Sequence, residues 1–110
     1  MLLPNADRAV VEDGKARDYL LSPSHPVGRF KSVFFIALGF SLDEWQILRD
    51  ALLELARGGD ATPGQPSPFG QKFEIRATLQ GPSGRQAAVL VVWMFSNGQD
   101  FPHFVTAFPA

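Results

Sequence analysis

The chain has 110 residues, a formal net charge of −1 and a pI of about 6.0, which makes it the size of one ordinary domain, residues 1–110. The near-neutral charge counts against a nucleic-acid binder that works by bulk electrostatics, although a local basic patch is compatible with it. The chain has no cysteine, which excludes disulfides, thiolate nucleophiles and cysteine metal ligands.

The sequence shows neither a signal-peptide pattern nor a membrane-spanning stretch. The segment Met1–Arg8 lacks the basic start and the long apolar run of a signal peptide. The longest wholly apolar stretch, Ala87–Phe95, is too short to cross a membrane. We therefore expect a soluble, cytoplasmic protein that does not bind membranes, whose oligomeric state the sequence leaves open.

The first forty residues predict three short elements. Residues 9–11 are a strand candidate, and Asp13 can cap a helix over about residues 14–21. Pro26 suits the first turn of a second helix, because its missing N–H costs nothing there. Apolar residues at helical spacing follow it, and Gly39 is a good C-terminal stop.

The third predicted helix is the best defined element of the chain. Ser41 and Glu44 match a capping box, and the helix should run to about Arg57 before Gly58 and Gly59 end it. Its apolar residues recur three and four apart and should form one buried stripe: Trp45, Leu48, Leu52, Leu55 and Ala56.

The rest of the chain predicts a loop and three strands. Residues 58–70 are rich in proline and glycine and are expected to form a loop with at most a short extended piece. Turn signals at Gly81–Gly84 and Asn97-Gly98 separate strands at residues 72–80, 85–95 and 101–108. The predicted fold class is α+β: a short N-terminal strand, three helices, then a three-stranded antiparallel meander packed against the helices.

A histidine and a lysine flank the predicted start of the second helix. The helix dipole disfavours the imidazolium, so a neutral His25 could act as a general base near pH 7. Lys31, one and a half turns into the helix, could stabilise an oxyanion or a pentavalent phosphate. A turn histidine that caps backbone amides and a solvated lysine explain the same residues equally simply.

Three polar residues of the predicted strands are further candidates. Arg76 and Arg85 are expected to face each other across the turn and to clamp a phosphate, or to form ordinary surface ion pairs. Thr106 is expected on the same face as Phe104 and Phe108, where its hydroxyl could orient a phosphate or a ribose oxygen. An ordinary β-branched strand residue would look the same.

His103 is predicted to lie on the opposite face from Thr106, in a structural or exposed role. Two histidines without close spacing do not match a zinc site, so no metal site is predicted. The sequence contains neither a phosphate-cradling glycine-rich loop nor a Gly-x-Ser-x-Gly elbow. It therefore predicts no cofactor.

Several segments spread over nearly the whole chain resemble an uncharacterised bacterial family whose domain has no known function. They are Leu3–Ala9, Tyr19–Gly28, Lys31, Phe35, Leu38–Phe40, Gly81–Arg85, Val92-Trp93 and Val105–Pro109. Members of this family occur as small free-standing proteins, and similar modules form the C-terminal part of toxin-like and phage-associated proteins. Helices before an antiparallel sheet are similar to small ribonuclease toxins of the barnase, EndoU, colicin and RelE type.

This resemblance implies a site of one histidine, one lysine, a late-strand threonine and phosphate-binding arginines: His25, Lys31, Thr106, and Arg76 or Arg85. The chain departs from the family pattern at Ser32 and Phe108, where alanine and tyrosine are common. The missing tyrosine argues against a mechanism that needs a phenol at the end of the last strand.

Two functions of different classes follow, and the sequence leaves open whether the chain is an enzyme. The favoured one is a non-catalytic interaction module (adaptor, immunity or assembly protein) that binds an unknown protein partner. The near-neutral charge, the loop 58–70 and the surface candidates Phe35, Phe40 and Phe69 suit it.

The alternative is a metal-independent ribonuclease with RNA as its partner. In this hypothesis His25 acts as acid or base, Lys31 and an arginine stabilise the phosphorane, and Thr106 positions it. The two hypotheses separate on one point, which is whether these three side chains converge in space.

Overall fold

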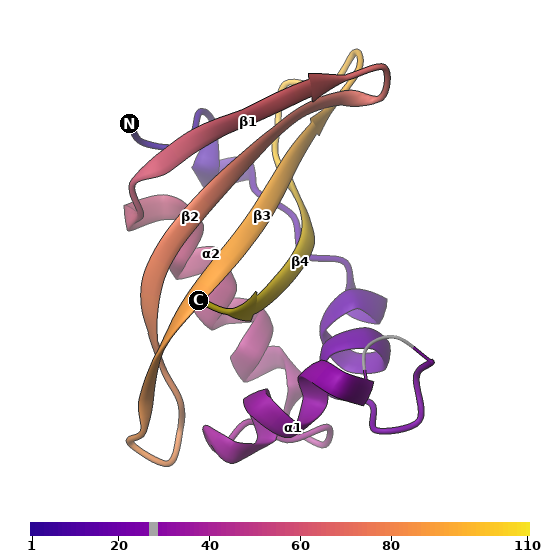
Figure 1. Ribbon diagram of the computed structural model, residues 1–110, viewed down its shortest axis with the longest axis vertical. Helices are drawn as coiled ribbons and strands as arrows, with labels where there is room; N and C mark the ends of the chain where they lie inside the picture. The colour runs from indigo at the N-terminus through magenta and orange to yellow at the C-terminus, as the bar shows by residue number, and fades with distance from the viewer. Residues whose placement is uncertain (27–28) are drawn as a thin grey trace.

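A computed structural model describes residues 1–26 and 29–110. Its elements in chain order are η1 (Ala6–Arg8), η2 (Lys15–Leu20), α1 (Arg29–Ala37), α2 (Trp45–Gly58), β1 (Ala61–Ser67), β2 (Gly70–Gln80), β3 (Gln86–Ser96) and β4 (His103–Pro109). The strands form one antiparallel sheet in the order β1-β2-β3-β4, with α2 behind it and with α1 and η2 near β4 (Figure 1). No helix of the described residues is long and apolar enough to span a membrane.

The sheet has four strands, where the sequence predicted three. β1 occupies the proline-rich segment that was expected to be a loop, and it pairs with β2 with a register irregularity between Pro63 and Pro66. Proline is tolerated on an edge strand, because its missing N–H removes no hydrogen bond on the unpaired side. The edge position therefore explains a strand whose composition predicts a loop.

The predicted N-terminal strand is reduced to an isolated bridge. Val10 pairs in parallel with His103. The Val10 amide donates to the Pro102 carbonyl at 3.0 Å, and the Phe104 amide donates to the Val10 carbonyl at 2.9 Å. These bonds tie the N-terminal segment to β4 without forming a fifth strand.

All three predicted helices exist, with shifted boundaries. The first is a π-helical turn, η2. The described part of α1 runs from Arg29 to Ala37, and residues 27–28 of the predicted helix lie outside the described residues. Ser41 Oγ accepts the Glu44 amide at 3.3 Å as predicted, but α2 begins at Trp45, three residues after the start that a cap at Ser41 implies.

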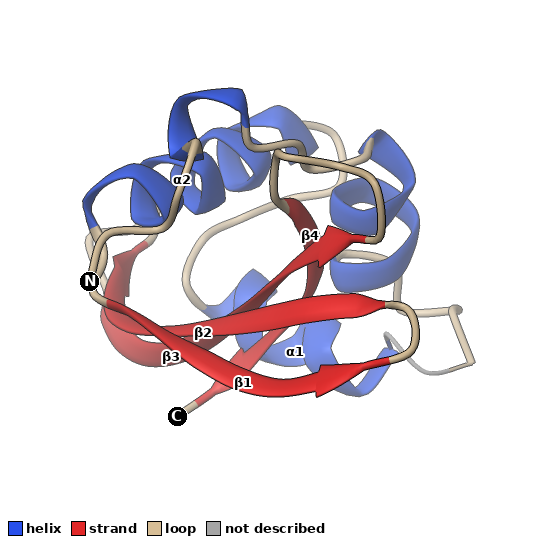
Figure 2. Cartoon of the chain, turned by 90° about the horizontal axis from the view of Figure 1, so that it is seen from above, coloured by secondary structure: helices blue, strands red, loops and turns tan. Residues whose placement is uncertain are grey.

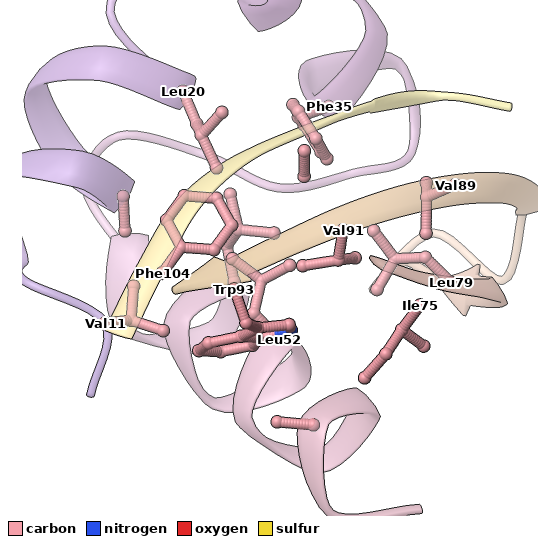
Figure 3. Packing of buried hydrophobic residues seen from close by; sticks show 14 of the residues in the cluster. Val11, Leu20, Phe35, Leu52, Ile75, Leu79, Val89, Val91, Trp93 and Phe104 are labelled. Atoms are coloured by element: carbon pink, nitrogen blue, oxygen red, sulfur yellow. The ribbon is translucent and has the colours of Figure 1, made fainter. Parts of the chain in front are cut away.

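The core lies between α2 and the inner face of the sheet (Figure 3). The predicted alternation of β2 is confirmed, since Ile75 and Leu79 are buried. The predicted central strand is also confirmed, with Trp93 fully buried against the ring of Phe104 at a centroid distance of 5.7 Å. The predicted stripe of α2 is buried at three positions and partly buried at two: Leu48, Leu52 and Ala56, then Trp45 and Leu55.

Two of the three phenylalanines proposed for the surface belong to this core. Phe35 and Phe40 are buried, whereas Phe69 is 76% exposed. The helical spacing of Phe35 places it toward the core, because α1 packs at the end of the sheet. The chain therefore lacks the aromatic surface patch that the interaction-module hypothesis invoked at these three positions.

The turn between β2 and β3 packs tightly on the C-terminal end of α1. A Cβ atom at Gly81 would lie 1.8 Å from the carbonyl oxygen of Leu38. Ser83 Oγ donates to the same carbonyl at 2.8 Å, and the Ser83 amide donates to it at 3.3 Å. This junction satisfies a helix-end carbonyl and fixes α1 against the sheet.

Candidate functional site

A pocket of about 570 Å³ opens where four chain segments meet beside β4. Those segments are the chain leading into η2, η2 itself, the turn and helix around α1, and the middle of β4 (Figure 1). The lining is basic and aromatic with one carboxylate: Glu12, Gly14, Lys15, Tyr19, His25, Lys31, Val105 and Thr106. His25, Lys31 and Thr106, predicted from the sequence as site residues, therefore line one pocket.

A β-bulge in β4 forms the floor of this pocket. Trp93 pairs with Phe104 and the preceding residue Val92 pairs with Thr106, so Val105 is an extra residue in β4. Lys15 Nζ donates to the Val105 carbonyl at 3.2 Å. The bulge thus presents a backbone acceptor that holds a lysine at the pocket.

The bulge also corrects two predictions about side-chain direction. Directly paired residues of adjacent strands share a face of the sheet, so Phe104 faces the core and Thr106 faces the opposite side. Thr106 and Phe104 were predicted on one face, which is wrong, whereas the shared face of Thr106 and Phe108 is confirmed. His103 pairs with Met94 and lies on the face of Thr106, not on the opposite one.

Lys31, Tyr19 and Thr106 form a closed hydrogen-bonded triangle. Lys31 Nζ donates to Tyr19 Oη and, at 2.7 Å, to Thr106 Oγ1. Tyr19 Oη and Thr106 Oγ1 lie 3.1 Å apart, and either can donate. An ammonium has three N–H donors, so the triangle leaves one for a ligand.

The triangle changes the acidity of the phenol. Burial raises the pKa of Tyr19, but hydrogen bonds with Lys31 and Thr106 and the positive charges of Lys31 and Lys15 outweigh it. The net pKa lies below the usual 10.0. Both lysines also lie over the ring, at 4.8 Å for Lys31 and 5.2 Å for Lys15 from its centroid. Tyr19 is therefore a better proton donor than an ordinary tyrosine.

His25 lies in the turn that leads into α1. Its ring meets the ring of Tyr19 edge-on, with centroids 5.2 Å apart and planes at 82°. Its carbonyl accepts the amide of Arg29, the first described residue of α1, at 3.1 Å. The imidazole and the phenol thus line the same pocket in direct ring contact.

The two arginines lie away from this pocket and from each other. Arg76 pairs with Leu90 across β2 and β3, whereas Arg85 precedes β3 in the turn, so the prediction that they face each other is wrong. Arg76 lines a separate cavity of about 270 Å³ together with Asp60, Thr62 and Glu74. Phosphate binding by either arginine stays a prediction.

Sequence reasoning missed Lys15 and Tyr19. In a short predicted helix a tyrosine is readily explained as a core residue and a lysine as a solvated one. Their spacing of four places them on one helical face, and Tyr19 is the only tyrosine of the chain. The signal that could have identified this pair is the single tyrosine of the chain one helical turn after a lysine.

Comparison with known proteins supports a family and a fold. The model of a family described as a domain of unknown function (DUF6883) matches residues 2–110. No curated protein matches the chain. A chain of the contact-dependent growth inhibition toxin–immunity protein complex from Klebsiella pneumoniae 342 shares the fold, with a TM-score of 0.70, 16% identity and 96% coverage of both chains. The protein therefore belongs to the DUF6883 family.

Proposed function

We propose that this protein is a ribonuclease of the toxin type that cleaves RNA without a metal ion. The observation that supports the proposal is the gathering of His25, Lys31 and Thr106, with Tyr19, around one pocket. An imidazole, an acidified phenol and a cation are the groups that phosphodiester transfer requires: a base, an acid and a charge stabiliser.

The proposed step is an internal transfer at phosphorus. His25 accepts the proton of the ribose 2′-hydroxyl, and the 2′-oxygen forms a bond to the phosphorus. The bond from phosphorus to the 5′-oxygen breaks, and the Tyr19 phenol gives its proton to that oxygen. The products are a 2′,3′-cyclic phosphate and a 5′-hydroxyl, and a water molecule returns the proton from His25 to Tyr19.

The two lysines stabilise the charge that develops during this step. The N–H of Lys31 that the triangle does not use donates to a non-bridging phosphate oxygen, while Thr106 holds the ammonium in place. Lys15, fixed on the bulge carbonyl, adds a second positive charge at the rim. Both charges are oriented before substrate binds, which lowers the reorganisation cost of the reaction.

The fold likeness also bears on a partner. The similar chain comes from a complex of a toxin with its immunity protein, so fold alone is compatible with either role. The pocket favours the toxin role for this chain, with RNA as substrate and the cytoplasm as site of action. A protein partner that covers the pocket would then act as its inhibitor.

The proposal is tested by incubating purified protein with cellular RNA in the presence of a chelator. We expect cleavage that leaves 2′,3′-cyclic phosphate ends and falls by about a hundredfold or more in His25→Ala, because a general base contributes roughly that factor. His103→Ala is the matched control, because this second histidine does not line the pocket. Absence of cleavage by protein that melts cooperatively, or full activity in His25→Ala, would contradict the proposal.

A further inference from the structure

The pocket is continuous with an open face of the sheet. α2 lies on one side of the sheet (Figure 2), and no helix of residues 1–26 or 29–110 crosses the opposite, outer face of β1, β2 and β3, which faces the viewer in Figure 1. Thr106 connects the pocket with the outer face, because it lines the pocket and also pairs with Val92 on that face. A polymer bound at the pocket can therefore continue over the sheet.

The next side chain of β4 on this face is aromatic. Phe108 pairs with Leu90, two residues along from the pairing of Thr106 with Val92. Its ring centroid lies 5.9 Å from Lys31 Nζ, and its side chain is only half-buried. An accessible aromatic ring thus lies beside the ammonium that we assign to the scissile phosphate.

Two apolar residues of β3, Leu90 and Val92, lie opposite Phe108 and Thr106 in the sheet. Leu90 and Val92 are only 7% and 9% exposed, so neighbouring side chains shield them from water. The group that can meet a nucleobase here is therefore the half-buried Phe108 ring itself, since stacking requires only a π-system and is tolerant of sequence.

We infer that Phe108 is a base-stacking residue and that the substrate is single-stranded RNA. The base of a nucleotide next to the scissile phosphate stacks on the Phe108 ring while the phosphate lies at Lys31. Bases inside an A-form duplex are already stacked and their faces are inaccessible, so a duplex cannot make this contact. The inference rests on the proposed ribonuclease function and specifies its substrate.

The test measures binding separately from cleavage. The probe is a 2′-O-methyl oligonucleotide, which lacks the attacking hydroxyl, and its Kd is compared for wild type, Phe108→Leu and Phe108→Tyr. We expect Phe108→Leu to weaken binding about tenfold, the typical loss of one stacked base, and Phe108→Tyr to bind as wild type. Phe108→Met replaces the leucine variant if its melting temperature falls.

An abasic nucleotide supplies the second arm of the test. Placed in turn at each position of the probe, it should weaken wild-type binding at one position and add no loss in Phe108→Leu, because both changes remove the same contact. Equal affinity of wild type and Phe108→Leu, additive losses, or preference for a duplex would overturn the inference while cleavage persists. Failure of the folded wild type to bind or cleave any RNA would instead overturn the ribonuclease proposal.

Discussion

Tyr19 is the only tyrosine of the chain, so tyrosinate absorbance follows its ionisation without interference from another phenol. We expect a titration midpoint below 10.0 in wild type, because the lysines and the Thr106 hydroxyl favour the phenolate. In Lys31→Gln the midpoint should rise, whereas in Arg85→Gln, which changes a distant cation, it should stay unchanged. A midpoint unaffected by Lys31→Gln would contradict the hydrogen-bonded triangle.

The same shift has a consequence for stability whose sign is fixed. The pKa of Tyr19 is lower in the folded than in the unfolded chain, so the folded state loses its phenol proton first as the pH rises. The resulting stabilisation is complete above the unfolded pKa of about 10 and is lost as the pH falls through the folded pKa. Urea unfolding of wild type and Tyr19→Phe should therefore diverge toward alkaline pH.

Individual site residues were predictable only where local pattern placed them. His25 and Lys31 were predicted because a proline and an apolar helix follow the histidine directly. Tyr19 was missed because a tyrosine in a short helix is usually interpreted as a core residue. Its hydrogen bond with Lys31 depends on the tertiary fold, which the local sequence does not describe. Thr106 was predicted on the correct strand, but it was placed on the same face of the sheet as Phe104. This is wrong because the one-residue bulge at Val105 turns the Thr106 side chain to the opposite face.

At the scale of elements, the junction between Gly81 and the end of α1 is the most sensitive contact. Gly81→Ala should destabilise the protein by about 2 kcal/mol or more, because its Cβ would overlap the Leu38 carbonyl and force the backbone apart. Chemical denaturation measures the loss. Gly58→Ala, in the last turn of α2 with nothing within 4 Å of the added Cβ, is the control and should be neutral or stabilising. Equal effects of the two changes would contradict this account of the junction.

Elements with one dominant signal were predictable, and β1 was not. α2 has strong 3.6-residue periodicity and β2 alternates cleanly, so both were placed within a few residues. β1 lacks an apolar alternation and contains Pro63 and Pro66, because an edge strand buries little and needs hydrogen bonds on one side only. Its existence depends on the β2 backbone beside it, which local sequence does not describe.

At the scale of the whole molecule, net charge is a poor guide to the pocket. The chain carries −1 overall, yet two lysines and a histidine line the pocket with a single carboxylate. Of the ten lysines and arginines and the eleven carboxylates, two lysines and one glutamate line the pocket, so the rest of the chain has eight cations against ten carboxylates. The charge argument against nucleic-acid binding therefore applies to the average surface and not to the site.

The two arginines differ in their position relative to the open face of the sheet. Arg76 shares a row with Leu90 and Phe108, whereas Arg85 lies in the turn at the end of the sheet. In a salt titration of binding to the 2′-O-methyl probe, Arg76→Gln should lower the salt dependence by roughly one phosphate contact, and Arg85→Gln should leave it unchanged. The opposite ranking would place the RNA path over the turn.

The bulge at Val105 divides β4 between two roles. With unbroken alternation, Phe104 and Thr106 would point the same way, so the strand would either give up the ring against Trp93 or withdraw its hydroxyl from Lys31. The extra residue lets Phe104 complete the interior while Thr106, two residues later, lines the pocket. On the proposed function, substitution of Phe104 should therefore affect mainly folding and substitution of Thr106 mainly turnover, although a single residue separates them.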